Sequence, residues 1–175
     1  MHQFSELVYR STAFSLSTLN EVESKVIEEL QTSGSTTLVK TLQMIQLQKA
    51  IIAVGMFSLF ESILQDALSC KHGFGEAKTI LTQLGKNDLN NRLEEFINAI
   101  NALKHGKGRS YDALITKSSS LPFRIKLPEE AFFNEGDVSE VSTLIKVNDE
   151  FVLNCAKLIE DVSEEIRKAR PDFFA

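Results

Sequence analysis

The residues of this chain whose types and spacing best suit chemistry gather around His105. Asn98, Asn101 and His105 are three and four residues apart, which places all three on one face of a helix. Two amides and an imidazole aligned at a helix end can hold a water, a ribose hydroxyl or a phosphate oxygen. Because imidazole titrates near neutral pH, His105 is a candidate for proton transfer in phosphodiester cleavage. The alternative interpretation is structural, with His105 donating to the last carbonyls of its own helix.

A basic turn with two glycines follows this histidine at residues 106–109, Gly-Lys-Gly-Arg. Such a turn can offer backbone N–H groups to a phosphate, and Arg109 can bind it through two parallel hydrogen bonds where a lysine offers only a point charge. The turn is no P-loop, because its residue order differs and no strand precedes it. Cations near a helix C-terminus are also favoured by the helix dipole alone, which accounts for Lys104 and Lys107 without a ligand.

Positive charge is concentrated in this part of an acidic chain. Residues 104–126 contain six Lys or Arg and one acid, a charge of +5, whereas the other 13 basic and 23 acidic residues give −10. The helix dipole does not explain Arg124 and Lys126, which lie well beyond the predicted helix end. The pattern indicates a local polyanion-binding patch rather than binding over the whole surface. Tyr111 follows the turn and either stacks on a base or anchors the turn by packing inward.

Other sites have less support. The histidines at positions 2, 72 and 105 lack carboxylates at ligand spacing, so neither a metal nor another cofactor is expected. Two distant cysteines in apolar helical contexts fit reduced thiols and the cytoplasm. No signal peptide is evident, and the most apolar stretch, residues 50–64, is interrupted by serine and glutamate. We expect that stretch to be too short and too polar to span a bilayer, and the protein to be soluble and cytoplasmic without a membrane partner.

Helical periodicity runs through almost the whole chain, which predicts one all-α domain over residues 1–175. We expect a bundle of about five helices with two or three long antiparallel helices. Long helices are predicted at about 4–32 and 38–71, shorter ones at about 76–84 and 87–105, and one or two turns at 110–117. The helix at 38–71 is apolar on most faces, as expected for a helix that is central or shared with a partner subunit.

An irregular loop is predicted at about 118–136, where two prolines and a polar tract interrupt the pattern. The last helix is expected to begin at Asp137, because Glu140 three residues later resembles a capping box. From there to Pro171 such a helix would be roughly 50 Å long.

A helix that ends in Asn-x-x-x-His, followed by glycine and a basic turn, is similar to the signature of HEPN domains. The resemblance extends to the long apolar second helix, with Phe57-Ser-Leu-Phe-Glu61, and to the order of the helices. It implies an all-α bundle that dimerises through two central helices. Active members are metal-independent endoribonucleases, many of them in toxin–antitoxin or antiphage defence systems. Their catalytic pattern is Arg, four to six residues, then His, with a polar residue often just after the Arg. By this resemblance His105 matches the histidine and Asn101 the polar residue, so both are assigned to catalytic positions.

The arginine of that pattern is absent. Its allowed places are Ile100, Ala99 and Asn98, none of which is basic. An arginine would neutralise charge that develops on the scissile phosphate, and loss of such a donor lowers the rate by a factor of about 10² or more. The resemblance therefore predicts impaired cleavage.

The combined prediction is a HEPN-like homodimer that binds RNA, a nucleotide or another phosphate ligand. Its binding residues would be Asn98, Lys104, Lys107, Arg109 and Tyr111. One alternative is an active endoribonuclease in which Arg109 or Lys104 replaces the missing arginine. The other is a protein-interaction module whose basic loop docks an acidic partner. The toxin–antitoxin context of the resemblance also makes an antitoxin-type protein a candidate partner.

Overall fold

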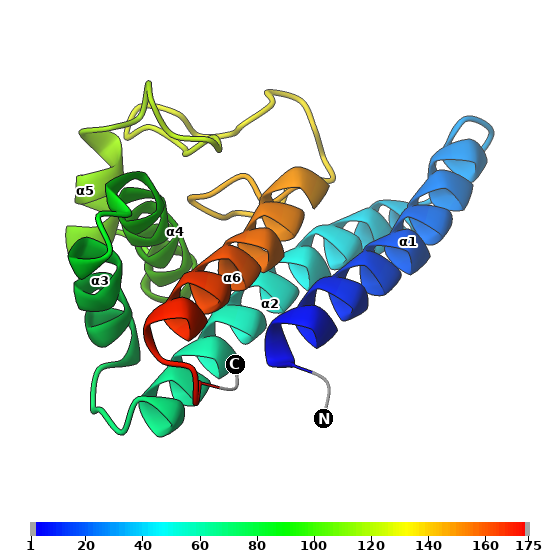
Figure 1. Ribbon diagram of the computed structural model, residues 1–175. Coiled ribbons are helices and arrows are strands. Elements are labelled where there is room, and N and C mark those ends of the chain that lie inside the picture. Colours follow the sequence, from blue (N-terminus) through cyan, green and yellow to red (C-terminus); the bar gives the residue numbers. More distant parts are fainter. Residues whose placement is uncertain (1–2, 174–175) are drawn as a thin grey trace.

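The structure is a computed structural model that describes residues 3–173, and these residues form six helices and no strand. The helices are α1 (Phe4–Leu30), α2 (Thr36–Ala67), α3 (Gly73–Gln83), α4 (Asn87–His105), α5 (Arg109–Ile115) and α6 (Asp149–Ala169). The long helices α1, α2 and α6 lie side by side, with α1 antiparallel to the other two, and α3, α4 and α5 pack at one end (Figure 1). The all-α helical bundle predicted from the sequence is confirmed.

Helix α2 is central in this bundle and packs against α1, α3, α4 and α6. Ala53, Phe57, Phe60 and Leu64, one apolar face of α2, are at most 1% exposed. An 18-residue window of α2 has a mean hydropathy of 1.5, so by length and composition alone the helix is apolar enough to cross a membrane. This corrects our expectation for residues 50–64, because that stretch belongs to a continuous helix of 32 residues. The contacts of α2 are those of a core helix in a bundle.

The last helix begins at Asp149, so the predicted start at Asp137 is wrong. Glu140 does not close a capping box, because its carboxylate accepts hydrogen bonds from Lys126 Nζ (2.9 Å) and from the amides of Phe133 (2.8 Å) and Asn134 (3.0 Å). The N-cap is Asn148, whose Oδ1 accepts from Phe151 N at 2.9 Å. With 21 residues α6 is about 32 Å long, shorter than the 50 Å expected.

The irregular loop between α5 and α6 is consequently longer than the predicted 118–136 and covers residues 116–148. Backbone hydrogen bonds from Lys126 to Leu144 and from Lys146 to Arg124 pair its two halves around an isolated bridge at Ile125 and Ile145. The loop is also fixed by an aromatic cluster. In it the Phe123 ring lies 5.1 Å from that of Phe96 on α4 and 5.3 Å from that of Phe151 on α6.

Helix α2 ends at Ala67, four residues before its predicted end, and then meets α3 closely. Ser69 adopts a left-handed conformation (φ 49°), which closes the helix with hydrogen bonds typical of a Schellman motif. At Gly73, the first residue of α3, a Cβ atom would lie 2.6 Å from the carbonyl oxygen of Glu61 and 2.8 Å from the Cβ of Leu64. Only glycine allows α3 to start this close to α2.

Candidate functional site

The turn between α4 and α5 brings two of the predicted basic residues to the same side of the molecule. Gly106 (φ 76°) and Gly108 (φ 156°) adopt backbone conformations that residues with a side chain rarely take. The amide of Gly106 donates to the carbonyl of Ala102 at 2.9 Å and closes α4, and α5 begins at Arg109. The chain reverses within three residues, so that Lys104 and Arg109 line one hollow.

Only half of the cations in the +5 segment are available to a ligand. Lys117 lies 4.0 Å from Glu95, Arg124 lies 3.0 Å from Glu130, and Lys126 lies 2.9 Å from Glu140. Lys104, Lys107 and Arg109, which we call the basic turn, are exposed and form no ion pair within residues 3–173. The patch predicted from the segment's charge is therefore reduced to these three side chains.

The polar row on α4 has the predicted orientation along one side of the helix. Asn98 and Asn101 are half-buried and His105 is exposed. None of the three side chains makes a hydrogen bond within the described part of the chain. The structural interpretation in which His105 donates to the last carbonyls of α4 is therefore not observed, and Gly106 alone closes the helix.

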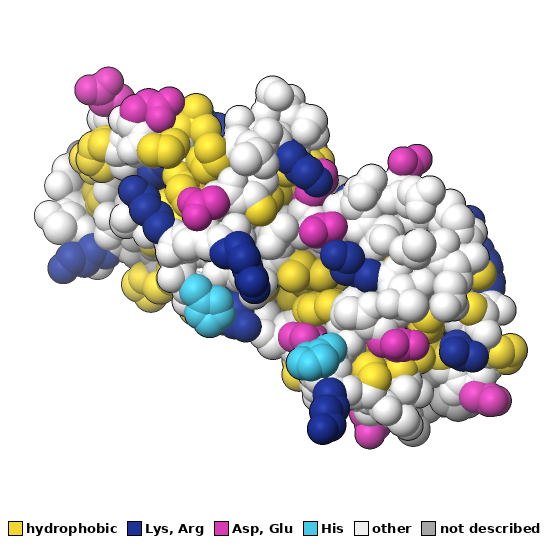
Figure 2. All heavy atoms as spheres, turned by 90° about the vertical axis from the view of Figure 1, so that its left-hand side faces the viewer, with side chains coloured by type: hydrophobic (Ala, Val, Ile, Leu, Met, Phe, Trp, Pro, Cys, Tyr) yellow, Lys and Arg dark blue, Asp and Glu magenta, His cyan; other side chains and the backbone are white. Residues whose placement is uncertain are grey.

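A hollow of about 470 Å³ lies beside the basic turn, between α2, α3, α4 and the start of α5. Asn101, Lys104 and Arg109 line it, so the structure brings these three predicted site residues together. Apolar side chains, among them Phe57 and Phe74, also line it. Figure 2 shows this face, with hydrophobic side chains at the bottom of a depression between two lobes and Lys and Arg side chains along its edges. Asn98, His105 and Lys107 lie outside the lining.

Tyr111 lies beneath the surface and is not available for stacking on a base. Its ring is 3% exposed, and its hydroxyl donates to the carbonyl of Lys126 at 2.6 Å. Burial, together with nearby carboxylates, raises the pKa of this hydroxyl. Tyr111 therefore anchors α5 to the following loop, which agrees with the inward-packing alternative and corrects its assignment as a ligand-binding residue.

The places allowed for the missing arginine are largely inside the core. Ala99 is fully buried and Ile100 is 4% exposed, so an arginine at either position would put a charge among apolar side chains. Only the half-buried Asn98 faces partly outward. The packing of α4 therefore disfavours an arginine at positions 99 and 100.

Three polar residues of the hollow were not predicted as site residues. Ser58 and Glu61 reach it from α2, and His72 reaches it from the N-cap of α3. They lie far from Asn101 in the sequence, so no residue spacing indicates that they share a site with it. The close contact at Gly73, which sets α3 against α2, brings His72 and Glu61 to the same hollow.

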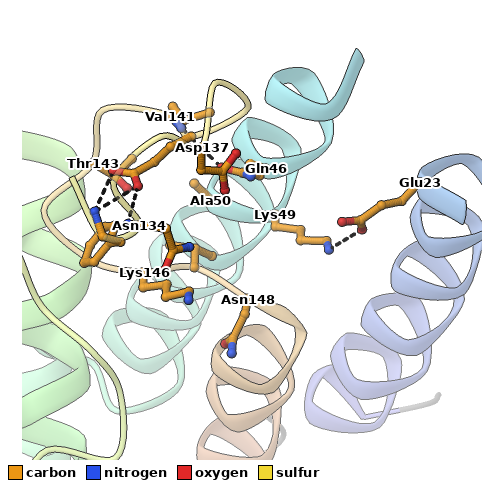
Figure 3. A pocket seen from close by; sticks show the side chains of 13 residues that line it. Glu23, Gln46, Lys49, Ala50, Asn134, Asp137, Val141, Thr143, Lys146 and Asn148 are labelled. Carbon is orange, nitrogen blue, oxygen red and sulfur yellow. Dashed lines mark hydrogen bonds and ion pairs between the residues drawn. The ribbon is translucent and has the colours of Figure 1, made fainter. Parts of the chain in front are cut away.

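A second cavity, of about 140 Å³, lies under the long loop beside α1 and α2 (Figure 3). Its buried charges are paired with one another rather than open to a ligand. Lys49 Nζ lies 3.0 Å from Glu23 and 2.8 Å from Asp149, and Figure 3 shows the lysine pointing toward α1. Burial would lower the pKa of Lys49, but hydrogen bonds from its ammonium to Asp149 and Glu23 outweigh this and raise it. This network joins α1, α2 and α6 and has a structural role.

No protein-family model, curated protein or solved structure matches this chain. The function has therefore to be inferred from its own residues. They define an all-α bundle with a solvent-open hollow whose Glu61, Lys104 and Arg109 side chains form no ion pair among residues 3–173.

Proposed function

We propose that this protein is a HEPN-like cytoplasmic homodimer that binds single-stranded RNA through the basic turn. The observation that carries the proposal is the contrast within the +5 segment. Lys117, Arg124 and Lys126 are paired with carboxylates, whereas the basic turn has no such partner in the described part of the chain. Three cations without counter-charges on an acidic protein favour an external polyanion. Arg109 offers paired N–H groups that match a phosphate.

Cleavage is impaired in this proposal. His105 is exposed and can accept a proton, but no cation occupies the motif positions, since Ala99 and Ile100 belong to the core. Phosphodiester cleavage needs stabilisation of the charge that develops on the phosphate, and an amide such as Asn98 supplies less of it than a guanidinium. A defence or toxin–antitoxin context fits a protein that captures RNA, with an antitoxin-type protein as a further partner.

The homodimer is supported by an exposed apolar surface on α1 and α2, which we call the α1/α2 face. Its members Phe14, Met44, Ile51 and Leu59 are 76%, 66%, 53% and 59% exposed. The groove between the two helices is lined without a single charged residue. An uncharged apolar face of this kind on a protein with 25% charged residues favours burial against a partner, and two acidic copies can meet there without opposing like charges.

The binding claim is tested by fluorescence anisotropy with a labelled single-stranded RNA. Arg109→Ala is expected to weaken binding several-fold, and Arg109→Lys to weaken it less, because lysine keeps the charge but not the paired donors. Lys40→Ala is the matched control, since Lys40 is exposed, has no ion-pair partner among the described residues, and lies on α2 outside the lining of the hollow. Equal affinities of Arg109→Ala and Lys40→Ala would exclude the basic turn as the RNA site.

The impaired-cleavage claim is tested by incubating RNA with the protein in EDTA. The native protein and His105→Ala are expected to give the same background cleavage. Faster cleavage by the native protein would show that His105 acts in catalysis without the motif arginine, and would identify the protein as an active endoribonuclease.

A further inference from the structure

The hollow beside the basic turn is lined by charged side chains of both signs. Lys104 and Arg109 contribute positive charge, and Glu61 on α2 contributes a carboxylate. None of these side chains forms an ion pair or side-chain hydrogen bond within residues 3–173. A ligand that satisfies all of them must carry both an anionic group and hydrogen-bond donors.

Much of the remaining lining is apolar and partly aromatic. Phe57 is 1% exposed and Phe74, on α3, is half-buried, and their ring centroids lie 5.9 Å apart. A volume of about 470 Å³ falls within the range of small-molecule sites. An apolar cavity of about 150 Å³ is enough for benzene, so this hollow has room for a bicyclic base with its ribose.

We infer that the hollow takes up one unpaired guanine nucleotide of the bound RNA, an inference that rests on the proposed RNA binding. The base lies on the Phe74 side of the hollow, and its 5′ or 3′ phosphate lies on Lys104 and Arg109. Asn101, which also lines the hollow, is available to the ribose hydroxyls. Recognition of a splayed-out base through stacking and its Watson–Crick edge is a common way to read single-stranded RNA.

Guanine is selected by the carboxylate of Glu61. A carboxylate has two acceptor oxygens and no donor, so it matches a base edge with two adjacent donors. Guanine presents such an edge, with N1–H beside the exocyclic N2 amino group. Adenine and cytosine each place an acceptor beside their amino group, and uracil has one N–H between two carbonyls, so each of them would direct an acceptor at the carboxylate.

The backbone at Glu61 is held by the contact between α2 and α3. Its carbonyl oxygen lies against Gly73, where a Cβ atom would come within 2.6 Å, so α2 and α3 are locked together at this point. The base edge therefore meets a carboxylate on a rigid helix, whereas the phosphate meets two exposed side chains that can adjust. Selectivity is expected to reside in Glu61, and the strength of phosphate binding in Lys104 and Arg109.

The test compares single-stranded oligoadenylates that carry one central guanine, inosine or adenine, measured by fluorescence anisotropy. The native protein is expected to bind the guanine oligonucleotide about tenfold more tightly than the adenine one, a modest value for one bidentate base contact. Inosine keeps N1–H but lacks the amino group, so its affinity should lie between them. Glu61→Gln should bind guanine and adenine alike, since its amide offers one acceptor and one donor group.

Glu28→Gln is the control, because it makes the same charge change at an exposed position of α1. Glu61 has no partner to lose within the described chain, so the circular dichroism and melting temperature of Glu61→Gln should match those of the native protein. Salt-dependent binding with equal affinity for guanine and adenine would overturn this inference and leave the proposed RNA binding intact. No salt-dependent binding of any oligonucleotide would overturn both.

Discussion

Replacing Glu140 by glutamine tests the role of its buried ion pair in the loop between α5 and α6. Residues 137–148 of this loop were predicted to begin the last helix but are irregular. The Glu140 and Lys126 side chains are each 8% exposed, and their charged atoms lie 2.9 Å apart. Glu140 Oε2 also accepts from the amides of Phe133 and Asn134. In Glu140→Gln the one remaining side-chain oxygen can still accept hydrogen bonds from those two amides. The side-chain NH₂ group then faces the Lys126 ammonium, so that two hydrogen-bond donors oppose each other.

The expected effect follows from leaving a buried ammonium without its counter-charge. Removing one partner of a buried ion pair destabilises by about 3–5 kcal/mol. The Lys126 ammonium keeps its contact with the Phe133 ring, 4.7 Å away, in both proteins, so it is not left without any favourable contact. We therefore expect a loss at the lower end of this range, about 3 kcal/mol. For a chain of this size that lowers the melting temperature by about 6–12 °C.

Urea unfolding and thermal melts monitored by circular dichroism measure this loss. The double variant Lys126→Met/Glu140→Gln removes the buried positive charge as well. Its loss in free energy of unfolding should therefore be smaller than the sum of the losses in the two single variants, by a coupling energy of about 1 kcal/mol or more. Glu164→Gln, which breaks an exposed contact with Lys168, is the control and should leave the midpoint unchanged. A Glu140→Gln protein as stable as this control would refute the assigned role of the buried pair.

Three further predictions concern stability and assembly. Burial opposes ionisation of Glu140 and Asp149, but hydrogen bonds from lysines and other donors outweigh it and lower both pKa values from their ordinary 4.5 and 3.8. Their contribution to the free energy of unfolding should therefore be fully present above these ordinary values and be lost as pH falls through the lowered pKa values of the folded protein. Urea titrations over a pH series measure this, and a rise in stability toward acid would contradict it. Gly73→Ala places a Cβ against the Glu61 carbonyl and should lower the free energy of unfolding by about 1–3 kcal/mol, whereas unchanged stability would mean that the two helices separate easily. Met44→Glu puts a charge on the α1/α2 face, so sedimentation should show a monomer where the native protein is a dimer, and a native monomer would end the dimer proposal.

The helices could be predicted because their signal is local. Apolar residues at helical spacing and the glycines at 106 and 108 mark elements within a few residues of where the structure has them. The start of α6 could not be predicted, because Asp137 and Glu140 form an acceptable capping pattern until the buried Lys126 competes for the same carboxylate. That competition joins residues 14 positions apart, and no local pattern reveals it.

The candidate site divides in the same way. Lys104 and Arg109 were found because both flank one recognisable turn. Glu61 and His72 were missed because they reach the hollow from other helices, and their approach depends on the contact at Gly73. Counting charge along the sequence overestimated the basic patch, since carboxylates at distant or neighbouring positions neutralise half of it.

The salt dependence of single-stranded RNA binding tests the central claim most directly. If Lys104, Lys107 and Arg109 each neutralise one phosphate, the slope of log K against log salt is about −2, and the affinity falls about 20-fold between about 50 and 200 mM salt. The double variant Lys104→Ala/Lys107→Ala should reduce the slope to about −0.7. The control Lys25→Ala/Lys40→Ala removes the same charge from exposed positions on α1 and α2, and it should leave the slope at about −2. A native slope near zero, or the same loss in both double variants, would contradict RNA binding at the basic turn.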